Sequence, residues 1–263
     1  MQTEKGDKMN KMNKKNIIKI ILDIAMAVLF ITFFNKELFG FRFHIIGGRL
    51  FALFIAVHMV LNRKWIVNIT KRLFDKKLNI RIKISYIVSL LLLISIGFII
   101  GSGVLMMKAP NYDRMMFWKM THFGASYLSV ALIGLHLGIY WTFVMNMFKK
   151  IFKIKSGNKN NQLIARICTV IILVFGLTTI YNDGYLAKLS GTLGYSIQHI
   201  QPQNIVEPEG GSSYQKEFVP FTNLAITYGS IISVFAIGSY YGDNYLKNKN
   251  KKKVKEIKAV EAS

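Results

Sequence analysis

FHIIGGRLFALFIAVH at residues 43–58 and THFGASYLSVALIGLH at residues 121–136 are two apolar stretches that share one pattern. In each, the second and the last residues are histidines, fourteen positions apart. An offset of 78 positions superimposes the two stretches and also matches KRLF at 71–74 with KKIF at 149–152. We interpret them as copies of one helical segment, with an intervening segment that returns the chain.

The rest of the chain extends this apolar pattern. It has 263 residues, 52% of them hydrophobic, but 35 Lys and Arg against 13 Asp and Glu. Six segments reach, or nearly reach, the ~20 residues that a spanning helix needs: 17–34, 43–62, 84–107, 118–147, 163–181 and 221–242. The sequence predicts an all-α integral membrane protein with six transmembrane helices.

Positive charge predicts its orientation. Most Lys and Arg residues lie in the N-terminal tail, after the second and fourth predicted spans, and in the C-terminal tail. By the positive-inside rule both termini are cytoplasmic, as in a multi-pass protein of a bacterial cytoplasmic membrane. Anionic inner-leaflet lipid is then the partner of the excess charge. We expect no nucleic-acid binding, because no basic stripe with exposed aromatics lies on a soluble domain.

The predicted organisation has four parts. They are a basic cytoplasmic tail at 1–16, a four-helix core at 17–150, two further spans at 151–246 and a disordered basic tail at 247–263. An extracytoplasmic connection at 182–220 contains EPEGGSS and is expected to have little regular structure.

The two histidines of each stretch share one helical face, because fourteen residues make about four turns and rise roughly 21 Å. The second and fourth spans run parallel. His44 therefore comes level with His122 near the outer surface, and His58 comes level with His136 nearer the cytoplasm. Two facing imidazoles can supply both axial ligands of a haem iron. The sequence predicts a haem-binding bundle with two haem b groups, whose iron ligands are His44, His122, His58 and His136.

Small residues lie beside these histidines, where a porphyrin would approach the helix backbone. We expect Gly48, Gly124 and Gly134 to belong to the cofactor-binding surface. Arg49 follows His44 by five positions and needs a partner in apolar surroundings. A haem propionate is one candidate, and a protein carboxylate or the headgroup layer is the other.

The cysteine content and the spacing of the histidines limit which other metal sites the chain can form. Cys168 is the only cysteine, so this chain alone forms no multi-thiolate metal site and has no c-type haem attachment. Copper or zinc held by the histidines is the alternative to haem, but its ligands would have to cluster within a few ångströms. Asp23 follows Lys19 by one turn, and we expect an ion pair there.

On these residues the chain resembles the four-histidine dihaem arrangement of respiratory cytochrome b and of the ferric reductase and NADPH oxidase membrane domains. More closely, it resembles the small bacterial family of flavinylation-associated cytochromes. The resemblance is carried by 43–65 and 121–141 and covers roughly residues 15–150. It implies transmembrane electron transfer, with the outer haem serving an extracytoplasmic redox protein that carries covalently attached flavin.

The chain is therefore interpreted as an electron-transfer component or oxidoreductase subunit, not necessarily an enzyme by itself. It has no Gly-x-Gly-x-x-Gly fingerprint, so the donor is quinol or another cytoplasmic-side molecule. Bound flavin is not predicted, because Leu193 follows the Ser-Gly-Thr at 190–192 where an acceptor threonine would be required. Two alternatives stay open: a membrane-anchor cytochrome b subunit of a larger oxidoreductase, and a non-redox transporter or scaffold.

Overall fold

The computed structural model describes residues 14–35, 39–76, 78–151, 159–200 and 220–261, and the regular secondary structure in these ranges is all helical. The helices are α2 (Lys14–Thr32), α3 (Gly40–Arg72), α4 (Ile80–Met107), α5 (Tyr112–Ile139), α6 (Trp141–Ile151), α7 (Lys159–Asn182), α8 (Tyr185–Gln198) and α9 (Phe221–Glu261). The all-α prediction is confirmed. Residues 1–13 of the predicted tail at 1–16 and residues 201–219 of the predicted connection at 182–220 lie outside the described residues.

Within the part of the chain that the structure describes, five helices are long and apolar enough to cross a membrane. They are Gly40–Arg72, Ile80–Met107, Tyr112–Ile139, Gln162–Asn182 and Phe221–Lys249. Many large apolar side chains on them are exposed, as expected of surfaces that face lipid. The first predicted span, α2, is not one of these five helices. It carries four charged residues within its 19 residues: Lys14, Lys15, Lys19 and Asp23. A multi-pass membrane protein is the architecture that these helices support.

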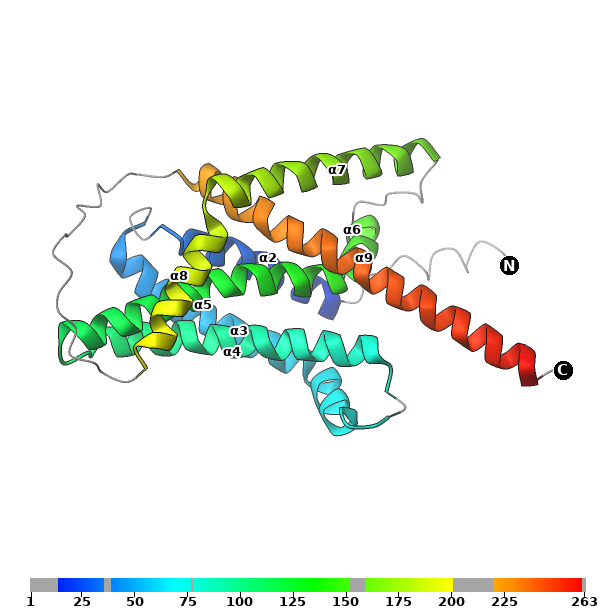
Figure 1. Cartoon of the computed structure of the whole chain (residues 1–263), viewed down its shortest axis with the longest axis horizontal. Coiled ribbons are helices and arrows are strands. Elements are labelled where there is room, and N and C mark those ends of the chain that lie inside the picture. Colours follow the sequence, from blue (N-terminus) through cyan, green and yellow to red (C-terminus); the bar gives the residue numbers. More distant parts are fainter. Residues whose placement is uncertain (1–13, 36–38, 77, 152–158, 201–219, 262–263) are drawn as a thin grey trace.

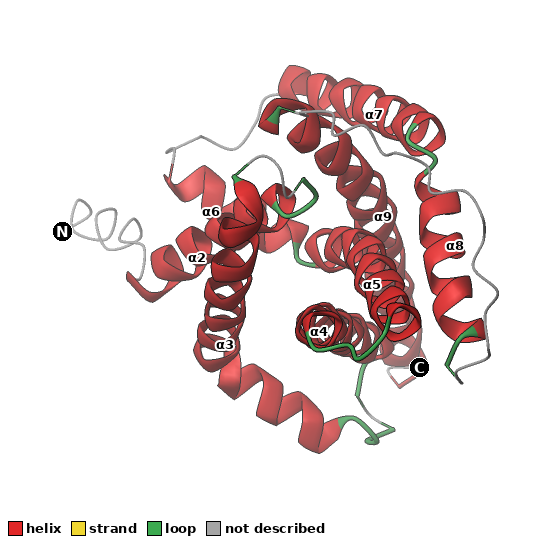
Figure 2. Cartoon of the chain, turned by 90° about the vertical axis from the view of Figure 1, so that its left-hand side faces the viewer, coloured by secondary structure: helices red, strands yellow, loops and turns green. Residues whose placement is uncertain are grey.

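The long helices lie side by side with alternating direction. In Figure 1, α2, α4 and α7 run one way along the long axis, and α3, α5 and α9 run the other way. In Figure 2, α2 and α3 occupy one side and α7 and α8 the other, with α4, α5 and α9 between them. The two helices with paired histidines, α3 and α5, are therefore parallel, as the repeat predicts.

Two segments that the sequence predicts to be irregular contain helix in their described residues. The connection at 182–220 contains α8, which begins after Gly184 in the left-handed region at φ 62°. The prediction of little structure overlooked Tyr185 and Leu189, which pack into the core. Helix α9 also continues to Glu261, through most of the tail that the sequence predicts to be disordered at 247–263. Lys, Glu and Ala are good helix formers, and a preceding membrane helix removes the cost of nucleation.

The ends of the observed helices also differ from the ends of the predicted spans. Helix α3 extends ten residues beyond the predicted end at 62, through part of the basic connection. The predicted span at 118–147 is divided, because α5 ends at Ile139 and α6 begins at Trp141. Tyr140 lies at this break, and its amide donates to the carbonyls of His136 and Gly138.

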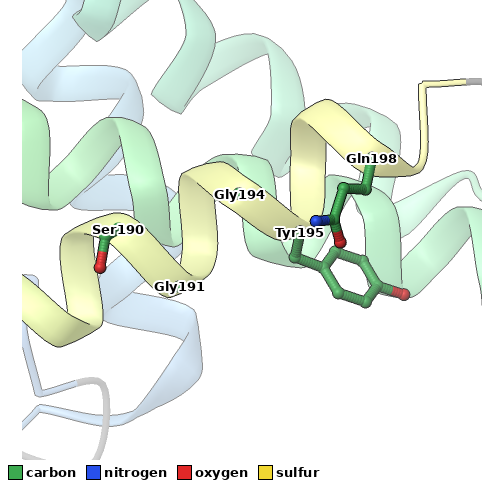
Figure 3. Close-up of a pocket in the computed structure, with 5 residues that line it drawn as sticks. All are labelled: Ser190, Gly191, Gly194, Tyr195 and Gln198. Atoms are coloured by element: carbon green, nitrogen blue, oxygen red, sulfur yellow. The ribbon is translucent and has the colours of Figure 1, made fainter.

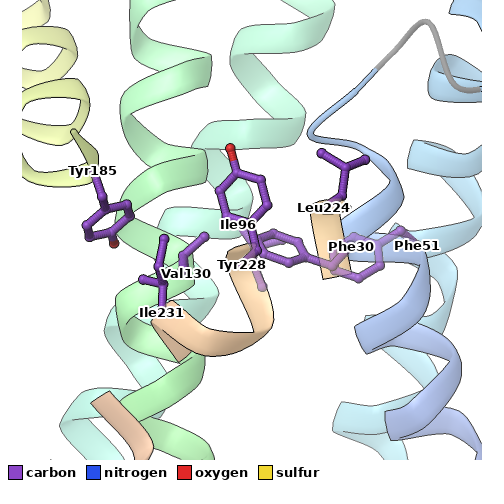
Figure 4. Close-up of a cluster of buried hydrophobic side chains, with 8 residues drawn as sticks. All are labelled: Phe30, Phe51, Ile96, Val130, Tyr185, Leu224, Tyr228 and Ile231. Atoms are coloured by element: carbon purple, nitrogen blue, oxygen red, sulfur yellow. The ribbon is translucent and has the colours of Figure 1, made fainter. Parts of the chain in front are cut away.

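One core cluster joins six helices. Its buried side chains are Phe30 of α2, Phe51 of α3, Ile96 of α4, Val130 of α5, Tyr185 of α8, and Leu224, Tyr228 and Ile231 of α9 (Figure 4). Polar contacts add specificity, since the Tyr185 hydroxyl donates to the carbonyl of Tyr127 at 2.7 Å. Helices α8 and α9 therefore pack directly on the predicted four-helix core, whereas α7 packs mainly on α9.

Helix α5 is the centre of this packing. On one side its Ser129 hydroxyl donates to Ser95 of α4 at 3.0 Å, and Ser95 donates to the carbonyl of Ala125 at 3.0 Å. On the other side Ser239 of α9 donates to the carbonyl of Leu135 at 3.0 Å. Small residues and interhelical hydrogen bonds are how membrane helices associate. By contrast, α3 makes few contacts with α4 and fewer still with α5.

A buried carboxylate ties α4 to α9. Asp243 is 3% exposed; Arg81 donates to both of its oxygens, and Lys247 forms an ion pair with it at 2.7 Å. We expect Asp243→Asn to lower the free energy of unfolding by about 1–3 kcal/mol, because Arg81 loses a charged acceptor. Thermal unfolding in detergent measures it. Asp75→Asn is the control, since Asp75 meets Arg72 at 3.8 Å on an exposed surface, and an equal loss there would contradict the prediction.

Candidate functional site

The structure brings His44 and His122 together. Their ring centroids are 6.0 Å apart, and the ring planes are inclined at 55°. His44 lies in the second turn of α3, and His122 lies in the third turn of α5. Two parallel helices that scarcely touch elsewhere thus present imidazoles to each other at one level. The predicted juxtaposition of the outer histidines is confirmed.

The Nδ1 atom of His122 is held by α4. It lies 2.8 Å from the carbonyl oxygen of Ile99. A carbonyl only accepts, so Nδ1 carries the proton and Nε2 of the neutral ring carries the lone pair. Gly103 of α4 lies against the ring, because a Cβ there would be 3.4 Å from two of its atoms. This contact and the hydrogen bond fix the ring's orientation.

Phe33 fixes the ring of His44 from the other side. The two ring centroids are 5.3 Å apart in an edge-to-face arrangement, and Phe33 also contacts Phe51 edge to face at 5.9 Å. Gly47 makes room for this packing, since a Cβ there would lie 3.0 Å from the Phe33 ring. The aromatic core of α2 and α3 therefore orients His44.

The inner histidines also have defined Nδ1 partners. His58 Nδ1 lies 2.7 Å from Oδ1 of Asp23 on α2, and a carboxylate accepts. His136 Nδ1 lies 3.1 Å from the hydroxyl of Ser89 on α4. Because the Ser89 hydroxyl donates its proton to the carbonyl of Ser85 at 2.8 Å, it accepts from His136. Both inner rings therefore carry their lone pair on Nε2.

The inner rings are less close than the outer ones. No ring contact joins His58 to His136, although both residues are described. His58 and Asp23 nevertheless act electrostatically on His136, so the three groups share one region. Tyr140 lies against the other side of His136 with ring centroids 4.9 Å apart, and its hydroxyl hydrogen-bonds Ser85 at 2.7 Å.

These contacts determine which ring nitrogen of each histidine is available to bind a metal. Three of the four histidines have Nδ1 engaged by the protein and Nε2 available as a ligand. Metal-binding histidines are normally held this way, through a second hydrogen bond that sets the tautomer and the ring plane. Among the described residues, no group of three or more His, Cys, Asp or Glu side chains gathers into a metal site. Of the four histidines, His44 and His122 form the pair whose rings are in contact.

Two of the three glycines predicted to line a cofactor have another role. A Cβ on Gly124 would lie 2.8 Å from Leu193 of α8, and one on Gly134 would lie 2.6 Å from the carbonyl oxygen of Ile232 on α9. Their missing side chains let α8 and α9 approach α5, which corrects the prediction. A Cβ on Gly48 would meet nothing within 4 Å, so that face of α3 is open.

Arg49 is exposed on α3, and none of the described carboxylates forms an ion pair with it. The predicted ion pair between Lys19 and Asp23 is wrong, because Asp23 accepts from His58 while Lys19 donates to Asn62 at 2.5 Å. Asp23 and Ser89 are the residues that sequence reasoning missed. An acidic residue in an apolar segment was the available signal for Asp23.

A shallow pocket lies on α8. Ser190, Gly191, Gly194, Tyr195 and Gln198 line it, all from one helix (Figure 3). The Tyr195 ring stacks on His199 with centroids 4.0 Å apart. Desolvation raises the pKa of the Tyr195 hydroxyl, and Asp113 and Tyr112 raise it further. Next to this pocket Leu193 turns inward to Gly124.

Comparisons of the chain with protein-family models, with curated proteins and with solved structures gave no match. What the protein does is therefore inferred from its four histidines and the groups that hold them.

Proposed function

We propose that the chain is a dihaem b-type cytochrome that transfers electrons across a membrane. In this proposal α2 to α5 form the haem-binding bundle, and all six long helices span the bilayer. Quinol or another cytoplasmic-side molecule donates, and an extracytoplasmic flavin-carrying protein accepts. The single observation that carries the proposal is the 6.0 Å separation of the His44 and His122 rings.

That separation suits two ligands of one metal. A metal–nitrogen bond is about 2 Å, so two rings bound on opposite sides of one metal have centroids roughly 6 Å apart once the ring radii are added. A haem iron needs two axial ligands, and each pair offers two imidazoles. The His44 and His122 pair therefore fits the group.

The surroundings of the histidines support the same assignment. Helix α3 packs on α2 but is sparsely packed against α4 and α5, and at Gly48 it exposes backbone. A flat macrocycle held between His44 and His122, and another between His58 and His136, would separate α3 from α5 in this way. Arg49 remains the candidate for a propionate partner, because it extends from the same open helix.

When bound, the two haems would supply one-electron redox chemistry at two depths of the membrane. The chain's own residues hold and orient the imidazole rings. Ile99, Asp23 and Ser89 fix three imidazoles through Nδ1, so that their Nε2 atoms would be available to hold the metal. Phe33 and Gly103 fix the outer rings by contact.

The proposed orientation follows from charge. We place both termini in the cytoplasm of a bacterium, with the lysine-rich ends of α6 and α9 near anionic inner-leaflet lipid. The His44 and His122 pair then lies near the outside, close to α8. An anchor subunit of a larger oxidoreductase would use the same pairs, and copurification of a soluble catalytic subunit would distinguish it.

A reduced-minus-oxidised absorption spectrum of the purified protein tests the proposal. We expect a low-spin b-type spectrum with two haems per chain, extracted as non-covalent haem b. A protein that is purified intact and is colourless, and stays colourless after haem reconstitution, would contradict it. That outcome would favour the non-redox reading, a transporter or scaffold.

A further inference from the structure

The histidines differ in the charge of the group that accepts their Nδ1 proton. On the outer side, His122 donates to a neutral backbone carbonyl at 2.8 Å. On the inner side, His136 donates to a neutral hydroxyl, but His58 donates to the carboxylate of Asp23 at 2.7 Å. Among these three defined contacts, one inner ligand alone has an anionic partner.

The position of Asp23 is set by the packing of α2 on α3. One helical turn before Asp23, Lys19 donates to the Asn62 side chain at 2.5 Å. The Asn62 amide in turn donates to the carbonyl of His58 at 2.9 Å. The two helices are therefore linked on the cytoplasmic side of the His58 ring, which keeps the carboxylate in hydrogen-bond range of Nδ1.

A carboxylate partner changes an imidazole as a ligand. It draws the Nδ1 proton toward itself, so the ring becomes more basic and donates more electron density through Nε2. Electron donation and a nearby negative charge both stabilise the oxidised, more positive iron. Second-shell hydrogen bonding of this kind tunes the reduction potential of a haem. A neutral acceptor has a weaker effect.

We infer that Asp23 is a positioning residue that gives the inner haem a lower reduction potential than the outer haem. This inference rests on the proposed function. It also sets the direction of transfer, because electrons move downhill from the His58 and His136 pair toward the His44 and His122 pair. The reaction that supplies them is oxidation of a donor at the cytoplasmic side, and the reaction that consumes them is reduction of an acceptor outside.

Potentiometric titration of the haem absorption tests the inference, with each haem isolated in turn. His122→Ala retains the inner haem, and His58→Ala retains the outer one. We expect the inner midpoint to lie below the outer midpoint. In the His122→Ala background, Asp23→Asn should raise the inner midpoint. The ratio of oxidised to reduced inner haem at a fixed potential should change about tenfold, or about 59 mV for one electron.

Two further variants separate this role from a structural one. Asp23→Glu keeps the charge and should restore most of the lower potential. Asp75→Asn removes a cytoplasmic-side negative charge that pairs with Arg72 and should leave the midpoint unchanged. A structural defect would lower haem content in both Asp23 variants without this pattern of midpoints.

The contradicting results are equally defined. An inner midpoint equal to or above the outer one overturns the inference, as does an Asp23→Asn midpoint equal to that of its parent. If Asp23→Asn loses the inner haem, the inference is tested by the order of the inner and outer midpoints in the proteins that retain Asp23. These results would leave two haems per chain and the proposed function intact, whereas a chain without haem removes the proposed function itself.

Discussion

His122→Ala should leave one haem per chain instead of two. In the proposed arrangement the substitution would remove one of the two imidazoles of the outer site and would leave His44 as the only protein ligand there. His44→Ala should do the same. His58→Ala and His136→Ala should instead remove the inner haem and leave the outer one. The haem-to-protein ratio and the midpoint of the remaining haem measure both effects.

His199 provides the matched control for these four substitutions. It is the fifth histidine of the chain, lies at the end of α8, and bonds the carbonyl of Tyr195 through Nδ1 at 2.8 Å. His199→Ala should keep two haems. If single substitutions in α3 and α5 leave the haem content unchanged, or if His199→Ala lowers it equally, the pairing is wrong. A loss of both haems from every variant would indicate unfolding, which size-exclusion chromatography detects.

The meeting of His44 and His122 was predictable because its signal is local and repeated. Fourteen residues bring two side chains to one helical face whatever the rest of the chain does, and the offset of 78 positions makes α3 and α5 equivalent. Membrane helices follow from apolar length in the same way. Both properties belong to a segment and its copy, so they need no knowledge of tertiary contacts.

The partners of the histidines depend on rotation and depth, which apolar length does not specify. Asp23 could face Lys19 on its own helix or His58 on the next, and the packing of α2 on α3 selects His58. Ser89 becomes an acceptor only because its proton goes to Ser85. Helix α8 was overlooked because EPEGGSS dominated the composition of its segment. Such errors occur where tertiary packing, and not the local sequence, determines which residues are in contact.

The glycines of α5 show most clearly that the sequence alone does not specify tertiary contacts. A glycine near a histidine permits a porphyrin or a neighbouring helix to approach, and the sequence does not distinguish them. The structure does, since the space beside Gly134 is filled by the Ile232 carbonyl and by Cβ of Phe235, each 2.6 Å from where its Cβ would be. Gly48 has no such neighbour within 4 Å.

Gly134→Leu is therefore expected to destabilise the chain strongly. The added side chain must push α9 away from α5, and overpacking costs about 1–3 kcal/mol or more where neighbours are rigid, as a helix backbone is. The Ser239 bond to the Leu135 carbonyl should be lost with it. The yield of monodisperse protein after detergent extraction and its unfolding midpoint measure the effect.

Gly48→Leu is the matched control, because the same side chain is added to a helix face that the rest of the chain leaves open. We expect it to fold like the parent. Equal stability of both variants would show that α9 does not press on α5 at Gly134. Haem content measured in the same preparations adds a second distinction. If Gly48→Leu folds but loses haem, a porphyrin lies against α3 there, and of the two glycines only Gly48 serves the cofactor while Gly134 serves the fold.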